Sequence, residues 1–256
     1  MTDNFNEYAQ YYDLLYRDKD YHSESVYVSK LLDLCLSKPV EKTSILDLAC
    51  GTGRHAQELA SMGYAVEGSD ISAEMVNVAN IRSAKNGQPI KFHNESFQTC
   101  NWIDRKFDAL IAMFSAIGYL SSYQDLALTM SNIRYLLVEN GVFIFDFWNG
   151  YAVAKNFSQT RIKRAKNGDD TVIRISNTVL DEISQIATVT FDFIWLKSGH
   201  IIREFSEVHS IRYYFPQEMV SLMEANGFSV IHRCPFLNAN NPIEPDDWNL
   251  TYVVRT

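Results

Sequence analysis

The chain has 256 residues, of which 46% are hydrophobic and 21% are charged, and its formal net charge is -8. This length predicts one or two domains with a core that needs no disulfide or metal, and the apolar fraction excludes disorder as the main state. The acidic balance argues against nucleic acid and anionic membranes as partners. No stretch approaches the roughly 18 apolar residues of a membrane-spanning helix, and residues 1–4 show no signal-peptide pattern.

The four cysteines are Cys35, Cys50, Cys100 and Cys234. Each lies in or beside an apolar run, and no pair has the spacing of a metal site. We therefore expect buried free thiols in a reducing cytoplasm and no bound metal. The basic cluster at 161–166 is interpreted as a solvated loop or helix face.

The first 40 residues predict helices. Residues 5–21 are crowded with tyrosines and predict an amphipathic helix followed by a charged loop. Residues 23–37 predict a second helix, which Pro39 ends.

From residue 44 onward, strands and helices alternate. Strands are predicted at 44–49, 64–69, 90–94, 107–114 and 141–148, and helices at 54–62, 72–86 and 123–137. Short links between alternating elements indicate a doubly wound, mostly parallel α/β sheet.

Residues 150–214 break this alternation. Three β-branched and aromatic runs, at 171–180, 186–196 and 200–214, predict an antiparallel meander. A helix at 216–226 and two strands at 228–234 and 249–255 follow. We therefore expect one α/β domain with an antiparallel insertion.

The run at 45–55 (ILDLACGTGRH) leads from a strand through a glycine turn into a helix. Gly51 and Gly53 let a ligand approach the backbone closely, and the helix start offers N–H groups to a nucleotide-like ligand. The spacing also fits the dinucleotide fingerprint G-x-G-x-x-A, so two ligand classes compete here.

Three carboxylates favour a ligand with a cationic group. Asp47, just before the turn, would repel a pyrophosphate but suits an ammonium. Asp70 ends the second strand and can accept from both hydroxyls of a ribose, and Glu95 after the third strand can accept from an adenine amino group. S-adenosylmethionine has these parts and carries no phosphate.

Five segments resemble the class I S-adenosylmethionine-dependent methyltransferases and occur in the expected order. They are LDLACGTG (46–53), VEGSDISAEMV (66–76), NESF (94–97), FDALIAMFSAIGYL (107–120) and LLVENGVFIFDFW (136–148). The resemblance implies a Rossmann-like seven-stranded methyltransferase sheet with an inserted antiparallel β-meander. It divides the single domain, 1–256, into a helical lid at 1–40, a cofactor-binding core at 41–150, an acceptor and dimer region at 151–214, and a completion of the core sheet at 215–256.

Further segments resemble the N,N-dimethyltransferases that act on dTDP-linked amino sugars of the desosamine and mycaminose type. They are YYDLLYRDKDY (11–21), MFSAIGYL (113–120), FDFWNG (145–150), RISNTVLD (174–181) and EVHSIRYYFPQEMVSLMEANGF (207–228). The resemblance implies in-line N-methylation of a small-molecule acceptor by a homodimer joined through the meander. The alternatives are another small-molecule amine, hydroxyl or carboxylate as acceptor, a non-catalytic S-adenosylmethionine-binding protein, and an NAD-dependent oxidoreductase.

The resemblance also implies roles for single residues. Contacts to S-adenosylmethionine are implied for Tyr21, Asp47, Ala49, Gly51, Gly53, Asp70, Ile71, Met75, Glu95, Ser96 and Met113. Contacts to the acceptor are implied for Tyr12, Tyr119 and Trp148, with Tyr119 or Tyr12 as the catalytic residue that orients the amine. Tyr119 stands where the family carries His in its F-S-[SA]-I-G-H turn, and tyrosine is a poor base near neutral pH.

Overall fold

The computed structural model describes residues 9–100 and 104–256, with only the backbone for residues 9–11. The predicted N-terminal helix therefore lies partly outside the described residues, and its described part is α1 (Ala9–Leu15). The second predicted helix is α2 (Tyr21–Cys35), whose N-cap Asp20 accepts from the amide of Ser23. A 3-10 turn at Val40–Lys42 leads into the first strand.

A seven-stranded sheet forms the centre of the molecule, in the order β10-β11-β5-β4-β1-β2-β3. Its strands are β1 (Ser44–Leu48), β2 (Ala65–Asp70), β3 (Lys91–Asn94), β4 (Phe107–Ala112), β5 (Leu137–Trp148), β10 (Ser229–Pro235) and β11 (Asn249–Arg255). Only β11 runs antiparallel to its neighbours β5 and β10. The predicted doubly wound, mostly parallel sheet is confirmed.

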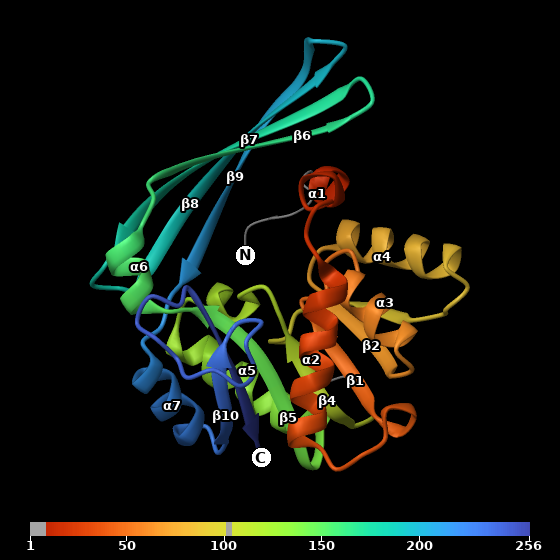
Figure 1. Cartoon of the computed structure of the whole chain (residues 1–256), viewed down its shortest axis with the longest axis vertical. Helices are drawn as coiled ribbons and strands as arrows, with labels where there is room; N and C mark the ends of the chain where they lie inside the picture. The colour runs from red at the N-terminus through yellow and green to blue at the C-terminus, as the bar shows by residue number, and fades with distance from the viewer. Residues whose placement is uncertain (1–8, 101–103) are drawn as a thin grey trace.

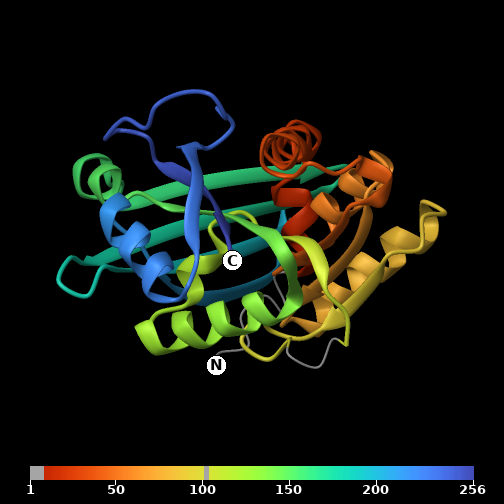
Figure 2. The same ribbon diagram turned by 90° about the horizontal axis from the view of Figure 1, so that it is seen from below.

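Helices cover both faces of this sheet, as Figures 1 and 2 show. They are α2, α3 (Arg54–Ser61), α4 (Ala73–Lys85), α5 (Tyr123–Leu136) and α7 (Pro216–Ala225). Alternate residues of a strand point to opposite faces, so Ile45 packs in one cluster with α2 and α3, and Leu46 in another with α5 and α7. The central strands β1 and β4 are buried on both sides, and the carboxyl ends of the parallel strands form one edge.

A second sheet of four antiparallel strands stands over that edge (Figure 1). Its strands are β6 (Thr160–Asn167), β7 (Asp170–Asp181), β8 (Ile186–Lys197) and β9 (His200–Arg212). The predicted meander corresponds to β7, β8 and β9. A short helix, α6 (Gly150–Asn156), connects β5 to β6 and was not predicted.

The interpretation of 161–166 as a loop or helix face is wrong. These residues form the edge strand β6, paired with β7 from Thr160↔Asn177 to Asn167↔Asp170. Long cationic side chains suit an edge strand because they remain solvated while the backbone pairs on one side. The Gly168 turn, with φ 58°, closes the hairpin.

Helix α1 lies between the two sheets (Figure 1). Leu15 packs against Val172 and Phe193 of the small sheet. On the other side, Asp13 accepts hydrogen bonds from Thr52 Oγ1 of the glycine turn and from Arg54 Nε at the start of α3, both at 3.0 Å. The helix therefore ties the small sheet to the central sheet and closes one side of the space between them.

The four cysteines are free, as predicted; Cys50, Cys100 and Cys234 are buried and Cys35 is half-buried. Within the described ranges, no helix is long and apolar enough to span a membrane.

Candidate functional site

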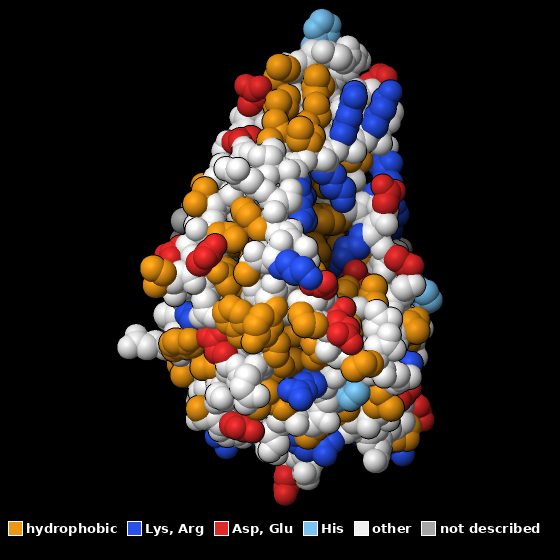
Figure 3. Space-filling view, turned by 60° about the vertical axis from the view of Figure 1, so that its left-hand side comes forward, with side chains coloured by type: hydrophobic (Ala, Val, Ile, Leu, Met, Phe, Trp, Pro, Cys, Tyr) orange, Lys and Arg blue, Asp and Glu red, His pale blue; other side chains and the backbone are white. Residues whose placement is uncertain are grey.

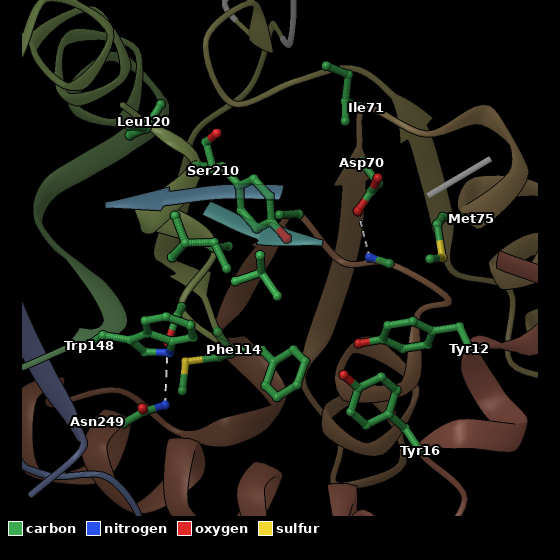
Figure 4. A pocket seen from close by; sticks show the side chains of 18 of the residues that line it. Tyr12, Tyr16, Asp70, Ile71, Met75, Phe114, Leu120, Trp148, Ser210 and Asn249 are labelled. Carbon is green, nitrogen blue, oxygen red and sulfur yellow. Dashed lines mark hydrogen bonds between the residues drawn. The ribbon is translucent and has the colours of Figure 1, made fainter. Parts of the chain in front are cut away.

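A cavity of about 790 Å³ lies between the carboxyl edge of the central sheet and the small sheet. Its volume is in the range of small-molecule sites. Every residue predicted for the site lines it except Gly53. Figure 4 shows Asp70, Ile71 and Met75 along one side, Trp148 and Asn249 on the opposite side, and Tyr12 and Tyr16 directed inward.

The glycine turn is anchored by Asp70. The amide of Gly51, where φ is 54°, donates to Oδ2 of Asp70 at 2.8 Å, and the amide of Ser72 donates to Oδ1 at 2.9 Å. Gly53 lies behind the lining, where an added Cβ would come 2.8 Å from the ring of Phe92. Asp70 therefore connects the turn to the start of α4, and Gly53 permits close packing beneath it.

Asp47 is a buried carboxylate that lines the cavity. Its Oδ2 atom has no hydrogen-bond partner among the described residues. Burial raises the pKa of Asp47 to about 8, and the charge of nearby Asp70 adds to the shift. A buried acceptor without a donor is costly, so this position fits the cationic group of a ligand.

Lys19, which was not predicted for the site, adds a positive charge to this end of the cavity. Its Nζ lies 2.8 Å from Oε2 of Glu24 and 4.0 Å from the ring centroid of Phe114. Glu24 also pairs with Nε2 of His55 at 2.7 Å. The YRDKDY run gave no signal beyond a charged loop, because the packing of α1 and α2 brings Lys19 to the cavity.

The side of the cavity at β2 and β3 combines apolar and polar groups. Ile71 is 53% exposed, whereas Met75 is buried. Oε2 of Glu95 accepts from Thr99 Oγ1 at 2.9 Å, and the hydroxyls of Ser96 and Thr99 lie 3.1 Å apart. An exposed Ile beside a row of acceptors suits a flat heteroaromatic ring.

A strained turn after β4 forms the opposite wall. Phe114 and Ser115 follow Met113 and have φ values of 65° and 57°, which non-glycine residues rarely adopt. Buried Asp146 accepts from the amide and hydroxyl of Ser115 at 2.9 and 3.1 Å, and Asn249 Nδ2 donates to it at 2.9 Å. Burial raises the pKa of Asp146 to about 6.

Tyr119, from the same connection, reaches across to the small sheet. Its hydroxyl lies 2.9 Å from Nδ1 of His209, and Nε2 of His209 lies 3.3 Å from Oε2 of Glu207. Burial raises the pKa of Tyr119 above its ordinary value, so this hydroxyl stays protonated near neutral pH. No local pattern in the sequence connects Tyr119 with His209, which is 90 positions away.

The small sheet contributes two arginines to the cavity, and two tryptophans from outside that sheet also line it. Arg161 and Arg174 both line the cavity. Arg174 Nη1 donates to the hydroxyl of Tyr16 at 2.8 Å, and Arg161 lies 5.5 Å from the ring centroid of Trp248. The rings of Trp148 and Trp248 meet edge to face at 5.7 Å. This end of the cavity suits an anionic ligand that carries a ring.

In comparisons with known proteins, this chain is similar to methyltransferases. A family model described as a methyltransferase domain matches residues 45–141. "Putative methyltransferase YqeM" of Bacillus subtilis (strain 168) is 31% identical over 193 residues, 75% of this chain and 76% of that protein. The dTDP-3-amino-3,4,6-trideoxy-alpha-D-glucopyranose N,N-dimethyltransferase of Streptomyces venezuelae is 29% identical over 227 residues, 88% of this chain and 91% of that protein.

Solved structures show the same fold. A S-adenosylmethionine-dependent methyltransferase from Clostridium acetobutylicum ATCC 824 superposes with a TM-score of 0.79, at 21% identity and 97% coverage of both chains. DesVI of Streptomyces venezuelae superposes with a TM-score of 0.75, at 25% identity, covering 96% of this chain and 97% of that one.

Proposed function

The chain belongs to the S-adenosylmethionine-dependent methyltransferases, and on that premise we propose that it methylates the amino group of a nucleotide-linked deoxy amino sugar. The cofactor is S-adenosylmethionine, which supplies a methyl group activated on a sulfonium. The acceptor is supported by the relatives that match most of the chain, including the small sheet. The alternative is another small-molecule amine, hydroxyl or carboxylate.

We assign the carboxyl edge of the central sheet to the cofactor. We assign the ammonium of the cofactor to Asp47, which ionises on binding, and its carboxylate to Lys19, because both side chains line this end of the cavity. Asp70 is placed to accept from the ribose hydroxyls with the lone pairs that Gly51 and Ser72 leave. The remaining contacts in this proposal are Tyr21, Ala49, Ile71, Met75, Glu95, Ser96 and Met113, all in the lining.

The basic end of the cavity carries the proposal for the acceptor. Arg161 and Arg174 lie in the same cavity as the carboxylates of the cofactor end. Guanidinium groups are well suited to phosphate oxygens, and Trp148 and Trp248 offer apolar surface beside them. A sugar linked to a nucleoside diphosphate would meet the arginines with its phosphates and extend its amine toward the centre of the cavity.

Methyl transfer needs little covalent chemistry from the protein, because the methyl group is already activated on the sulfonium. The acceptor must hold a nitrogen lone pair in line with the methyl carbon, and such positioning supplies several kcal/mol of barrier reduction. The amine must be neutral, and a cavity that excludes water favours the neutral form. Tyr119 and Tyr12 line the cavity where they can orient the amine through their hydroxyls.

We also propose that the protein is a homodimer joined through the outer face of the small sheet. Ile162, Val179 and Ile201 are 70%, 68% and 60% exposed. Hydrophobic side chains gather in rows on this part of the surface (Figure 3). Burying this face against a second copy would remove a large apolar area from water.

A binding and turnover experiment tests the proposed function. Isothermal titration with S-adenosylhomocysteine measures the cofactor end, and a methyl-transfer assay with dTDP-linked 3-amino and 4-amino sugars measures the acceptor. The matched controls are the free amino sugars and the dTDP-sugars that carry a hydroxyl instead of the amine. Binding without turnover on any amino sugar would refute the acceptor, while turnover on the hydroxyl sugars would favour O-methylation.

A further inference from the structure

Three side chains form a hydrogen-bonded chain that starts at the cavity and runs into the small sheet. It connects the hydroxyl of Tyr119 to Nδ1 of His209 at 2.9 Å, and Nε2 of His209 to Oε2 of Glu207 at 3.3 Å. Tyr119 follows β4, whereas His209 and Glu207 lie on β9. His209 is completely buried, and the ring of Phe191 packs edge-on against it at 4.9 Å.

The partners of His209 select one tautomer. A carboxylate only accepts hydrogen bonds, so Nε2 carries the proton and donates to Glu207. Nδ1 is then the acceptor for the Tyr119 hydroxyl. In this arrangement the phenolic oxygen can accept a hydrogen bond from a ligand in the cavity, which Tyr119 lines.

This inference rests on the proposed N-methylation: we propose that Tyr119, His209 and Glu207 together take up the proton of the acceptor amine. An alkyl ammonium near neutral pH has no lone pair with which to attack. The ammonium N–H donates to the oxygen of Tyr119 and transfers its proton, while Tyr119 passes its hydroxyl proton to Nδ1 of His209. Glu207 stabilises the imidazolium, the amine regains its lone pair, and no other bond forms or breaks.

The proton has to end on His209 rather than leave a tyrosinate. Burial and the neighbouring charges of Glu207 and Asp70 all disfavour an ionised Tyr119. Tyr119 is thus the catalytic residue that touches the amine, and His209 and Glu207 are positioning residues that hold the proton through it. Tyrosine alone is a poor base near neutral pH, but in this arrangement the proton passes through Tyr119 to His209.

Kinetics of conservative variants test the role of the chain. The probe is dTDP-3-amino-3,4,6-trideoxy-α-D-glucopyranose with saturating S-adenosylmethionine. His209→Asn keeps an acceptor for the Tyr119 hydroxyl but cannot hold the proton. We expect kcat to fall by about 10²-fold or more, as for loss of a general base, with KM for the probe changed by less than about threefold. Tyr119→Phe and Glu207→Gln should lower kcat in the same way.

The matched control is His93→Asn. His93 is a buried histidine that also pairs with a glutamate, Glu67 at 2.7 Å, on β2 and β3 outside the cavity. It should leave kcat unchanged, and every variant should bind S-adenosylhomocysteine like the wild type. A His209→Asn enzyme with wild-type kcat would overturn the proposal, because orientation of Tyr119 alone would then suffice.

Nuclear magnetic resonance of ¹⁵N-histidine-labelled protein gives a readout that needs no acceptor. We expect His209 in the Nε2–H tautomer, with an Nδ1 resonance that shifts in Tyr119→Phe; a Nδ1–H tautomer, or a resonance indifferent to Tyr119→Phe, would overturn the chain. A wild-type protein that binds S-adenosylhomocysteine but methylates no amino sugar would overturn both proposals. Turnover of the probe at wild-type rate by His209→Asn would overturn only this one.

Discussion

The carboxylate of Asp146 holds the backbone of Ser115 in a left-handed conformation, at the point where the chain leaves β4 and enters the cavity wall. Oδ1 accepts from the amide of Ser115 at 2.9 Å, and Oδ2 accepts from its hydroxyl at 3.1 Å. Phe114, one residue earlier, shares the positive φ. Two successive non-glycine residues in this region cost free energy, and the buried carboxylate offsets that cost.

Asp146→Asn should therefore reduce both stability and turnover. The side chain of the new Asn would direct an amide N–H at one of the three donors that now bind the Asp146 carboxylate. That donor would lose its acceptor, and an unsatisfied buried group costs about 1–3 kcal/mol. We expect the melting temperature to fall by about 3–10 °C, together with a lower kcat. Differential scanning calorimetry and the methyl-transfer assay measure the two effects. A variant with wild-type values in both would show that the turn keeps its conformation without the Asp146 carboxylate.

Because of the Asp146 carboxylate, we expect an acid limb in the pH profile of kcat. Its pKa is raised by burial from 3.8 to about 6. Turnover should fall as pH decreases through about 6, because protonation removes an acceptor from the turn. The stability of the fold depends on pH in the opposite direction from turnover. Because the pKa of this carboxyl is raised in the folded state, the group stabilises the fold at low pH, and that contribution is lost as pH rises through about 6. An acid limb that persists in Asp146→Asn would belong to another group.

We expect cofactor binding to release a proton from Asp47. Its pKa is raised by burial to about 8, so most molecules carry a neutral Asp47 at pH 7 before binding, and pairing with the ligand's ammonium requires the carboxylate. Affinity for S-adenosylhomocysteine should therefore weaken by up to about tenfold per unit as pH falls below 8. Calorimetric titration in buffers of different ionisation enthalpy should show release of about one proton at pH 7.

Asp47→Asn is the control for this release. The variant should bind more weakly, with an affinity that no longer follows pH in this range through Asp47. Equal proton release by the variant and the wild type would assign the linkage to a different group.

Arg161 and Arg164 provide a matched pair on β6. Arg161 lines the cavity, whereas Arg164 is exposed and absent from the lining. Arg161→Ala should raise KM for a dTDP-linked amino sugar by about 10–100-fold, the value of a hydrogen bond to a charged group. Binding of S-adenosylhomocysteine should stay unchanged, and Arg164→Ala should alter neither. Equal effects of the two variants on KM would point to general electrostatic attraction instead of a phosphate contact.

The proposed dimer has a similar internal control. Val179→Lys places a charge on the outer face of the small sheet, whereas Ile183→Lys does so in the β7–β8 turn, where the side chain is 97% exposed. Sedimentation at micromolar concentration should show dimers for the wild type and Ile183→Lys and monomers for Val179→Lys. A monomeric wild type would refute the interface.

The sequence by itself determined the central architecture and the carboxylates of the cavity. Period-two and 3.6-residue patterns and turn residues are local properties, so the alternation after residue 44 and the meander could be predicted. The parallel strands then bring their carboxyl ends to one edge, which places Asp47, Asp70 and Glu95 in one cavity. The edge strand β6 escaped prediction because its charges resemble a solvated loop, although they lie in an edge strand paired on one side only.

Only the tertiary structure decided which distant side chains meet. Asp146 with Ser115, Tyr119 with His209, and Lys19 with Phe114 depend on strand order, register and the packing of whole elements. None of these leaves a local pattern in the chain, because a contact between residues 31 or 90 positions apart is set by the packing of whole elements. The local sequence therefore specifies the elements and the kind of ligand, while their packing supplies the strained turn and the histidine behind Tyr119.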